Sequence, residues 1–515
     1  MRLAKVLFGI VAVLVVVLAG LRLTHPLPSL PGGPATTAIP AGPETRLGAA
    51  LLPLAQVHPG LSGVVPLVDG RDALAARVLL ARAAEVSIDV QYYIWQTDTT
   101  GWLLLDELRA AADRGVRVRL LLDDNGIPGL DNVLADLDAM ETVEVRLFNP
   151  FTLRRPKLLS YGFDFFRLNR RMHNKSMTAD GIATVIGGRN IGDIYFAYGE
   201  GTAYFDFDVL AVGPAAADVA ADFDRYWSSG SAYAAADILP RPRAGIAELA
   251  RAAEVARRSV GGSAYLAAVA EAPVVGRVLA GDDILEWTTV TLVSDDPAKG
   301  LGRADGAGLL IGRLPGLLSQ PVESVDLVSA YLIPGSRGTA LLESYAAAGV
   351  RTRIVTNSLE ATDVPIVHSG WMRYRERLVR AGAEVLELRA RPDHDDGASP
   401  ARLLTGSQSS LHAKTFAVDG QRIFIGSFNF DPRSAMLNTE MGFLIESPLI
   451  AGALGRSLDG ARTFYRVVAA PDGGLNWIER RADGGTVVHS AEPNTSAMQR
   501  VMVLVLGWLP VEWML

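Results

Sequence analysis

The chain of 515 residues contains no cysteine. This absence excludes disulfide bonds, cysteine metal ligands, a cysteine nucleophile and a lipidated cysteine. Positive charge is not in excess either, because the net charge is −7 and charged residues make up 20% of the chain. An acidic balance argues against a duplex-DNA-binding protein, although it leaves room for a local basic groove. The apolar fraction of 49% indicates a globular or membrane-associated protein.

An unbroken apolar run lies near the N-terminus. It extends from Val6 to Leu21, follows Arg2 and Lys5, and is followed by Arg22 and a Pro/Gly-rich linker. A membrane-spanning helix needs about 20 apolar residues, and a secretory signal carries a shorter run before a small-residue cleavage site. We favour a retained signal anchor. A cleaved signal peptide and a wrongly assigned start site stay open as alternatives.

Beyond the linker, strand and helix patterns alternate, and the second half of the chain repeats the order of the first. Each half contains a strand–helix–strand unit, at residues 86–94, 101–114 and 116–122 and at residues 324–332, 338–348 and 350–356. Such units imply parallel strands with a right-handed crossover. The sequence therefore predicts an α/β protein with two pseudo-symmetric domains, each a mixed sheet flanked by helices.

The same patterns suggest boundaries for five parts of the chain. We expect an anchor and linker (1–43), a first domain (44–245), a connection (246–284), a second domain (285–470) and an apolar tail (471–515). Residues 286–293 read as the first strand of the second domain. The tail carries Trp508 and Trp513, which suits a membrane interface, but packing on the second domain explains it equally well.

Two of the seven histidines begin nearly identical segments. In each segment a lysine follows two positions later, an aspartate seven, a small residue fifteen and an asparagine seventeen positions later. The members are His173, Lys175, Asp180, Gly188 and Asn190 in the first segment, and His412, Lys414, Asp419, Ser427 and Asn429 in the second.

The spacing brings polar groups of one kind to one place. In a strand, residues i and i+2 project from the same face, so each histidine and its lysine project together. The Asp-Gly steps after them predict tight turns, and the returning strand brings the asparagine back beside the lysine. Asp180 and Asp419 belong to these turns. As members of the motif they are counted with the catalytic residues His173, His412, Lys175 and Lys414, although a role confined to capping the turns is favoured for both.

Cations and amide donors stabilise charge on phosphate oxygens. One such set binds a phosphate, whereas two facing sets can catalyse displacement at phosphorus. One histidine must be neutral to attack, and the other must be protonated to supply the leaving alcohol with a proton, which a pKa near 6.5 allows for both. The sequence thus predicts one active site at the domain interface. We expect no cofactor and no metal, and do not count His394, in an acidic segment, as a metal ligand.

The duplicated H-x-K-x4-D-x6-G-G/S pattern resembles that of the phospholipase D superfamily. Further segments are similar to the C-type branch of bacterial cardiolipin synthases, namely residues 91–101, 117–131, 145–151, 167–176, 187–196 and 509–515. This resemblance covers the chain from about residue 45 onward. It implies transfer of a phosphatidyl group to phosphatidylglycerol through a phosphohistidine. The donor is phosphatidylethanolamine or a second phosphatidylglycerol.

The resemblance also implies roles that spacing cannot assign. It makes His173 the nucleophile and His412 the general acid and base, and it pairs each histidine with a distant carboxylate. Our candidates are Glu440 for His173 and Asp206 for His412, with Asp208 as the alternative to Asp206. Lys175, Lys414, Asn190 and Asn429 should bind phosphate oxygens, beside Gly188 and Ser427.

Three other functions remain in competition with phosphatidyl transfer: a hydrolytic phospholipase D, a nucleic-acid phosphodiesterase and a non-catalytic lipid-binding relative. The acidic balance and the apolar ends of the chain argue against nucleic acid as a partner. Complete motifs in both copies argue against loss of catalysis. We expect a bacterial inner-membrane protein with one N-terminal anchor and an extracytoplasmic catalytic part. The sequence gives no prediction about protein partners.

A basic segment precedes the first motif, with aromatic residues interleaved. It can seat anionic headgroups at a membrane surface, or it can be a solvated loop. Its cations are Arg154, Arg155, Lys157, Arg167, Arg170 and Arg171. Outside both motifs, His368 is expected to have a structural role.

Overall fold

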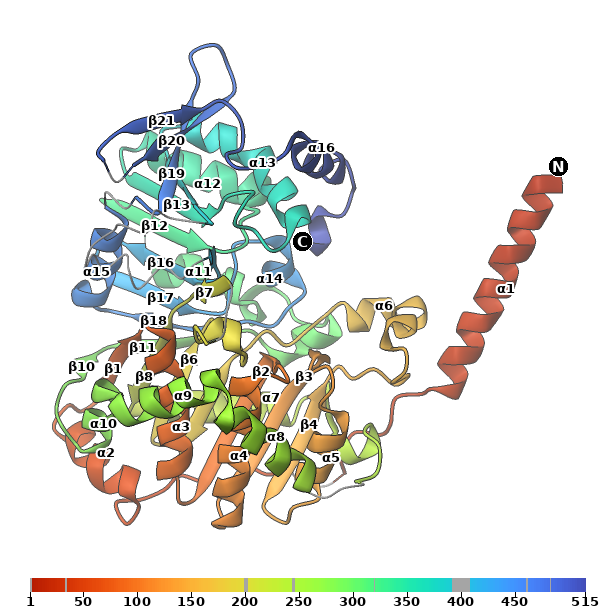
Figure 1. The fold of residues 1–515 in the computed structure, drawn as a ribbon, viewed down its shortest axis with the longest axis vertical. Helices are drawn as coiled ribbons and strands as arrows, with labels where there is room; N and C mark the ends of the chain where they lie inside the picture. Colours follow the sequence, from red (N-terminus) through yellow and green to blue (C-terminus); the bar gives the residue numbers. More distant parts are fainter. Residues whose placement is uncertain are drawn as a thin grey trace.

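The computed structural model describes residues 2–32, 35–198, 202–242, 246–318, 320–390, 408–459, 462–481 and 483–515. His394 lies outside these residues. Figure 1 shows two domains stacked on one another, each built around one large sheet, with helix α1 (Arg2–Thr24) standing apart at one side. Residues Lys5–Thr24 of this helix are long and apolar enough to cross a membrane, and they are not buried by the rest of the chain.

The first domain contains a nine-stranded sheet. Its strands lie in the order β10 (Glu286–Thr288), β1 (Ser62–Leu67), β8 (Asp208–Val212), β6 (Ala183–Gly187), β5 (Ser176–Ala179), β2 (Ser87–Ile94), β3 (Arg117–Gly126), β4 (Val143–Phe148) and β9 (Ala232–Ala234).

The second domain contains a ten-stranded sheet. Its strands lie in the order β11 (Val290–Ser294), β18 (Met441–Ile445), β17 (Arg422–Gly426), β16 (Lys414–Val418), β12 (Ser324–Ser329), β13 (Arg351–Asn357), β14 (Glu384–Leu388), β19 (Phe464–Ala469), β20 (Leu475–Arg480) and β21 (Thr486–His489).

The two sheets repeat one topology. The run β1-β8-β6-β5-β2-β3-β4-β9 matches β11-β18-β17-β16-β12-β13-β14-β19, with the same parallel and antiparallel pairings. A buried ion pair is repeated too, between Asp89 and Arg119 in the first sheet and between Asp326 and Arg353 in the second. The predicted α/β fold of two pseudo-symmetric domains is confirmed.

Helices cover the sheets, as the strand–helix–strand pattern requires. Those of the first domain and the connection are α2 (Arg46–Gln56), α3 (Gly70–Ala83), α4 (Thr99–Asp113), α5 (Asp131–Asp138), α6 (Ser160–Leu168), α7 (Pro214–Trp227), α8 (Ala247–Arg258), α9 (Val260–Glu271) and α10 (Pro273–Leu279). Those of the second are α11 (Leu310–Leu318), α12 (Gly335–Ala347), α13 (Pro365–Arg380), α14 (Pro432–Met436), α15 (Pro448–Leu458) and α16 (Ala497–Leu506).

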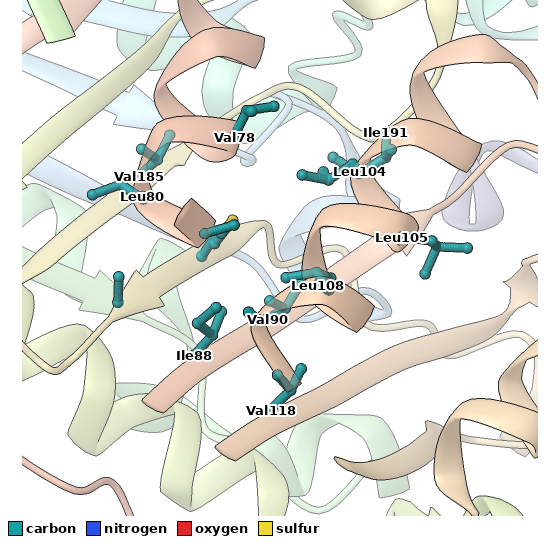
Figure 2. Close-up of a cluster of buried hydrophobic side chains, with 14 of the residues drawn as sticks. Val78, Leu80, Ile88, Val90, Leu104, Leu105, Leu108, Val118, Val185 and Ile191 are labelled. Carbon is teal, nitrogen blue, oxygen red and sulfur yellow. The ribbon is translucent and has the colours of Figure 1, made fainter. Parts of the chain in front are cut away.

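The core of the first domain lies between its sheet and helices α3 and α4. Figure 2 shows Ile88, Val90 and Val118 of the sheet with Leu104 and Leu108 of α4, all buried. A second buried cluster joins the domains, because Ile186 and Val209 pack with side chains of the other sheet that include Ile423 and Phe443. This shared apolar interface fixes the two motifs relative to one another.

Residues 286–293 do not form one strand of the second domain, so that expectation is wrong. β10 pairs with β1 in the first sheet, and β11 pairs with β18 in the second. An extended apolar segment satisfies the hydrogen bonds of either sheet edge equally well, so its sequence pattern cannot show that it passes from one sheet to the other. The segment therefore connects the domains.

The tail, residues 471–515, is partly built into the second domain. β20 and β21 extend the second sheet beyond β19, and α16 contacts α13. A small parallel pair of strands, β7 (Thr202–Phe205) and β15 (Gln408–Leu411), also joins the two domains just before the second motif.

Candidate active site

Each motif histidine is held by the backbone of the opposite domain. The His173 amide donates to the Thr439 carbonyl at 2.9 Å, and the His412 amide donates to the Phe205 carbonyl at 2.8 Å. Both side chains are nearly buried. Each of these hydrogen bonds crosses the domain interface. Each histidine is therefore positioned by a backbone hydrogen bond to the other domain.

A carboxylate from the opposite domain contacts Nδ1 of each histidine. Glu440 Oε2 lies 2.8 Å from His173 Nδ1, and Asp206 Oδ2 lies 2.5 Å from His412 Nδ1. These are the partners that the resemblance suggested. A hydrogen bond at Nδ1 fixes the tautomer and the orientation of the ring and leaves Nε2 for the phosphorus or the leaving oxygen.

Asp208, the alternative partner of His412, lies elsewhere. Its carboxylate pairs with Arg77 at 2.9 Å and with Arg189 at 3.5 Å, both buried. In one continuous strand Asp206 and Asp208 would project from the same face, but β7 ends at Phe205 and β8 begins at Asp208. The break between β7 and β8 decides which of the two aspartates faces His412. The sequence pattern does not show this break.

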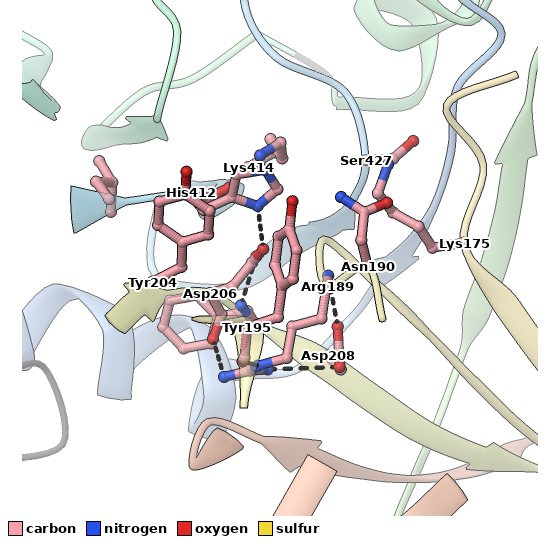
Figure 3. Close-up of polar contacts among 12 residues, drawn as sticks. Lys175, Arg189, Asn190, Tyr195, Tyr204, Asp206, Asp208, His412, Lys414 and Ser427 are labelled. Atoms are coloured by element: carbon pink, nitrogen blue, oxygen red, sulfur yellow. Dashed lines mark hydrogen bonds and ion pairs between the residues drawn. The ribbon is translucent and has the colours of Figure 1, made fainter. Parts of the chain in front are cut away.

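The motif lysines are buried beside the imidazoles. Lys175 Nζ donates to the His173 carbonyl at 2.6 Å, and Lys414 Nζ donates to the His412 carbonyl. Figure 3 shows Lys175 and Asn190 of the first domain beside His412 and Lys414 of the second, in one cluster of polar side chains. His173 Nδ1 lies 3.2 Å from the carbonyl oxygen of Ser427 in the second motif, so the two motifs form one site.

Both motif asparagines keep a polar atom for a ligand. Asn190 Oδ1 accepts the Ile94 amide at 3.2 Å, and its Nδ2 is buried with no hydrogen-bond partner among the described residues. Asn429 likewise has a buried Oδ1 without a partner in the described part of the chain. Buried polar atoms are rarely left unpaired, so a phosphate oxygen is the natural partner of the Asn190 Nδ2 donor, whereas the Asn429 Oδ1 acceptor suits a hydroxyl group of the substrate.

The small residues differ between the motifs for a geometric reason. A Cβ on Gly188 would lie 2.0 Å from Asp206 Oδ1, so this position has no room for a side chain. At the corresponding place, Ser427 Oγ donates to Glu440 Oε2 at 2.5 Å, and its carbonyl lies 3.2 Å from His173 Nδ1. The last residue of each motif therefore suits the carboxylate beside it: Gly188 leaves room for Asp206, and Ser427 donates a hydrogen bond to Glu440.

The motif aspartates lie at the far end of their strands and take the turn-capping position that we favoured. Asp180 accepts the backbone amides of residues 85–87, and Asp419 accepts those of residues 322–324. Both have positive φ, at 54° and 53°. Each ties its hairpin to the start of the neighbouring central strand, β2 or β12. These contacts support a turn-capping role for Asp180 and Asp419. They do not support the catalytic role that membership of the motif suggested.

The charge states of the two carboxylates differ. Burial raises the pKa of Glu440 to about 7, although the charge of Lys175 opposes this shift. Burial would raise the pKa of Asp206 too, but the charges of His412, Lys414 and Arg189 hold it below its ordinary value. Asp206 is therefore ionised near neutral pH, whereas Glu440 is divided between its two forms.

Burial also lowers the pKa values of the cations. It lowers the pKa of His173 well below its usual value, and Lys175 and Lys414 lower it further. Burial and Lys414 lower the pKa of His412, whereas Asp206 opposes the shift. Burial lowers the pKa of Lys175 to about 7 and that of Lys414 to about 8. A bound phosphate would reverse these shifts, because it neutralises the cluster of like charge.

Four tyrosines lie around the motif histidines and Lys414, and our sequence reasoning missed them. The Tyr204 ring stacks on His412 at 5.0 Å between centroids, and Tyr195 contacts it edge-on at 5.2 Å. Tyr93 lies edge-on to His173 at 5.1 Å, and Lys414 Nζ lies 5.9 Å from the Tyr331 ring. Tyr204 stands two residues before Asp206, a spacing that could have revealed it.

The basic segment before the first motif is largely neutralised within the protein. Arg154 pairs with Asp124 and Asp131, and Lys157 pairs with Asp124. In the same way, Arg167 pairs with Asp164, and Arg171 pairs with Asp123. Neither a headgroup-binding cluster nor a freely solvated loop describes this segment.

His368 is buried in α13, where Nε2 lies 3.3 Å from Glu492, a contact that fits a structural role. Within the described ranges, His, Asp and Glu side chains do not gather in a group that could hold a metal ion.

Comparison with known families agrees with this geometry. The sequence profile described as "Cardiolipin synthase, PLD-like domain" matches residues 79–227 and 315–460. The chain belongs to this phospholipase D-like family. Cardiolipin synthase C of Escherichia coli (strain K12) is 45% identical over 472 residues, which make up 91% of this chain and 100% of that protein. The predicted membership of the superfamily and the predicted enzyme class, a phosphatidyltransferase of the cardiolipin synthase type, are therefore confirmed.

Two more distant matches also cover most of the chain. Cardiolipin synthase B of E. coli (strain K12) is 26% identical over 377 residues, 73% of this chain and 75% of that protein. The crystal structure of phosphatidylserine synthase from Haemophilus influenzae Rd KW20 matches 81% of this chain and 91% of its own, with a TM-score of 0.51 and 15% identity. At that identity the match supports the fold alone.

Proposed function

We propose that the enzyme makes cardiolipin in two steps at one phosphorus atom. His173 Nε2 attacks the phosphorus of the donor lipid, and the bond to the headgroup oxygen breaks. His412 gives its proton to that oxygen, so free glycerol or ethanolamine leaves. His412 then takes the proton of a phosphatidylglycerol hydroxyl, the new oxygen bonds to phosphorus, and His173 is released.

The observation that carries this proposal is the reciprocal pairing of each imidazole with a carboxylate from the other domain. Ionised Asp206 stabilises the imidazolium that His412 must form as an acid. Glu440 and the two lysines surround His173, and deep burial keeps its ring neutral and nucleophilic. This difference supports the proposed direction of the mechanism, with His173 as nucleophile.

Lys175, Lys414, Asn190 and Asn429 would hold the non-bridging oxygens of the phosphodiester. Charge on these oxygens grows during attack, and buried, already oriented donors stabilise it without reorganisation. The tyrosines around both rings exclude water from the site, which favours a lipid alcohol over hydrolysis.

We further propose that α1 anchors the protein in the bacterial inner membrane with both domains outside the cytoplasm. A single cysteine at Leu449, an exposed residue of α15, tests the side of the membrane. Membrane-impermeant maleimide should label it in intact spheroplasts. Labelling only after lysis would place the catalytic domains inside.

The decisive experiment follows lipid products. Purified full-length protein in vesicles of phosphatidylglycerol, with and without phosphatidylethanolamine, should form cardiolipin and release glycerol or ethanolamine. Separate isotopic labels on the two headgroups identify the donor. Phosphatidic acid as the only lipid product would replace this proposal with a hydrolytic phospholipase D.

A further inference from the structure

Exposed apolar side chains gather on three segments. They are α1, the tip formed by the short 3-10 helix η1 (Lys157–Leu159) with α6, and the C-terminal segment from α16 to Trp513. We call the second the α6 tip and the third the C-terminal segment. Figure 1 shows α1, α6 and α16 on the same side of the molecule, whereas α15 lies on the opposite side.

The α6 tip exposes residues that would normally be buried. Leu158 is 76% exposed and Phe166 is 75% exposed. Grouped large apolar side chains in contact with water mark an interaction surface rather than an ordinary exterior. The tip belongs to the first domain, and α6 ends shortly before His173.

The C-terminal segment carries a similar face in the second domain. Met498, Val501, Val505 and Trp508 are all at least half exposed and follow helical spacing, with Trp508 at 83%. Tryptophan prefers the boundary between lipid chains and water. This segment also contacts the chain between Asn429 and Glu440, because the Leu515 carbonyl accepts the Arg433 amide at 2.8 Å, and Arg433 Nη2 donates in turn to Asn169 of the first domain at 2.7 Å.

The α6 tip is continuous with the anchor helix. Arg22, at the end of α1, donates to the Phe163 carbonyl at 3.1 Å and lies 3.3 Å from Asp164. Because Arg154 and Lys157 beside the tip already pair with carboxylates, attraction to anionic lipid is not its main property. Burial of apolar area is the favourable interaction that this surface offers.

We propose that the α6 tip and the C-terminal segment insert into the lipid bilayer as a second membrane contact, separate from α1. The α6 tip belongs to the first domain and lies shortly before His173 in the chain. The C-terminal segment belongs to the second domain and contacts Arg433, which lies between Asn429 and Glu440 in the chain. The site is thereby held at the bilayer surface, where a diacyl substrate can reach it without leaving the lipid. This inference rests on the membrane location proposed above.

The chain's lack of cysteine allows a direct test on the full-length protein. Single cysteines at Leu158, Val501 and, as a control, Leu449 on α15, which is 65% exposed, would carry an environment-sensitive fluorophore. In phosphatidylcholine vesicles with brominated acyl chains, quenching is expected at positions 158 and 501 and not at 449. It should persist at high salt, because an apolar contact is not screened.

Equal quenching at all three positions, or none at 158 and 501, would overturn the inference. Quenching that needs anionic lipid or disappears at high salt would also overturn it. If cardiolipin still forms in either case, the proposed function stands while this surface assignment fails.

A second variant separates docking from folding. Leu158→Asp with Phe166→Asp should lower the rate on vesicles by roughly tenfold, because the tip loses apolar area that it would bury in lipid. The rate on water-soluble dihexanoyl phosphatidylglycerol should stay unchanged. An equal loss on both substrates would indicate a folding defect or an active-site role and would overturn the docking role of the tip.

Discussion

His173 and His412 occupy equivalent places in the two domains, yet their surroundings differ in charge. Asp206 is held ionised by His412, Lys414 and Arg189. Glu440 is buried with a pKa of about 7 and shares its Oε2 between His173 and Ser427. The two domains thus carry two copies of one motif, and in the proposed mechanism the differences at the carboxylates separate the nucleophile from the acid.

Removing each histidine gives the largest expected effect. His173→Ala should abolish the covalent adduct, whereas His412→Ala should still form it from a substrate with a good leaving group, because that step needs no acid. With lipid substrates, loss of His412 should cost about 10²–10⁴-fold in kcat. Protein denatured at alkaline pH, where a phosphohistidine is stable, is examined by mass spectrometry, and His489→Ala serves as the control. An adduct on His412 would reverse the assigned roles.

Neutralising the carboxylates compares the sites directly. Asp206→Asn should lower kcat by about 10²–10³-fold, because the imidazolium of His412 loses its counter-charge. Glu440→Gln should lower it only about tenfold, because a neutral group still accepts the Nδ1 hydrogen bond of His173. Steady-state rates on mixed vesicles give both numbers. The opposite ranking would make His412 the nucleophile.

Exchanging the small residues tests the same asymmetry. Gly188→Ala should lower kcat by about 10–100-fold, because its Cβ would displace Asp206 from His412. Ser427→Gly removes one hydrogen bond to Glu440, which contributes about 1 kcal/mol, so a loss of a few-fold is expected. Thermal unfolding of both variants controls for folding. Equal losses would show that the two positions are interchangeable.

The pH dependence follows from the buried cations. In the free enzyme, burial and Lys414 lower the pKa of His412, so its acid proton is already being lost at neutral pH, and Lys175 and Lys414 lose their protons as pH rises through about 7 and 8. The value of kcat/KM should therefore fall as pH rises from neutrality, by up to about tenfold per pH unit. Protonation of His173 should lower kcat/KM only well below pH 6.5, because burial depresses its pKa. A value of kcat/KM that still rises from pH 7 to 9 would contradict charged lysines as the phosphate ligands.

The smallest effect is expected at the aromatic contacts. Tyr204→Phe keeps the ring on His412 but loses the hydrogen bond to Asp363, which is 2.8 Å long and partly exposed. The free energy of unfolding should fall by about 0.5–1.5 kcal/mol with little change in kcat. Tyr204→Leu removes the ring as well and should raise the fraction of phosphatidic acid. Unchanged product ratios would contradict a water-excluding role for this ring.

The sequence predicted much of this arrangement because the relevant signals are local. The H-x-K spacing places Lys175 beside His173, and the Asp-Gly turn returns Asn190, each within one hairpin. The parallel pairs β2–β3 and β12–β13 follow from the repeated strand–helix–strand units. The segment from β10 to β11 failed as a prediction because an edge strand carries no mark of which sheet it joins.

Residue identity and spacing alone therefore determined the fold class, the two phosphate-binding hairpins and the need for two histidines. Only the tertiary structure decided which carboxylate faces which imidazole, how far each pKa moves, and which apolar segments share one side of the molecule. Those properties depend on burial and on contacts between residues more than 200 positions apart, such as His412 and Asp206. Electrostatic interactions are stronger where water is excluded. Water is excluded from this site only when the two domains pack together, so the sequence alone cannot show how far each pKa moves.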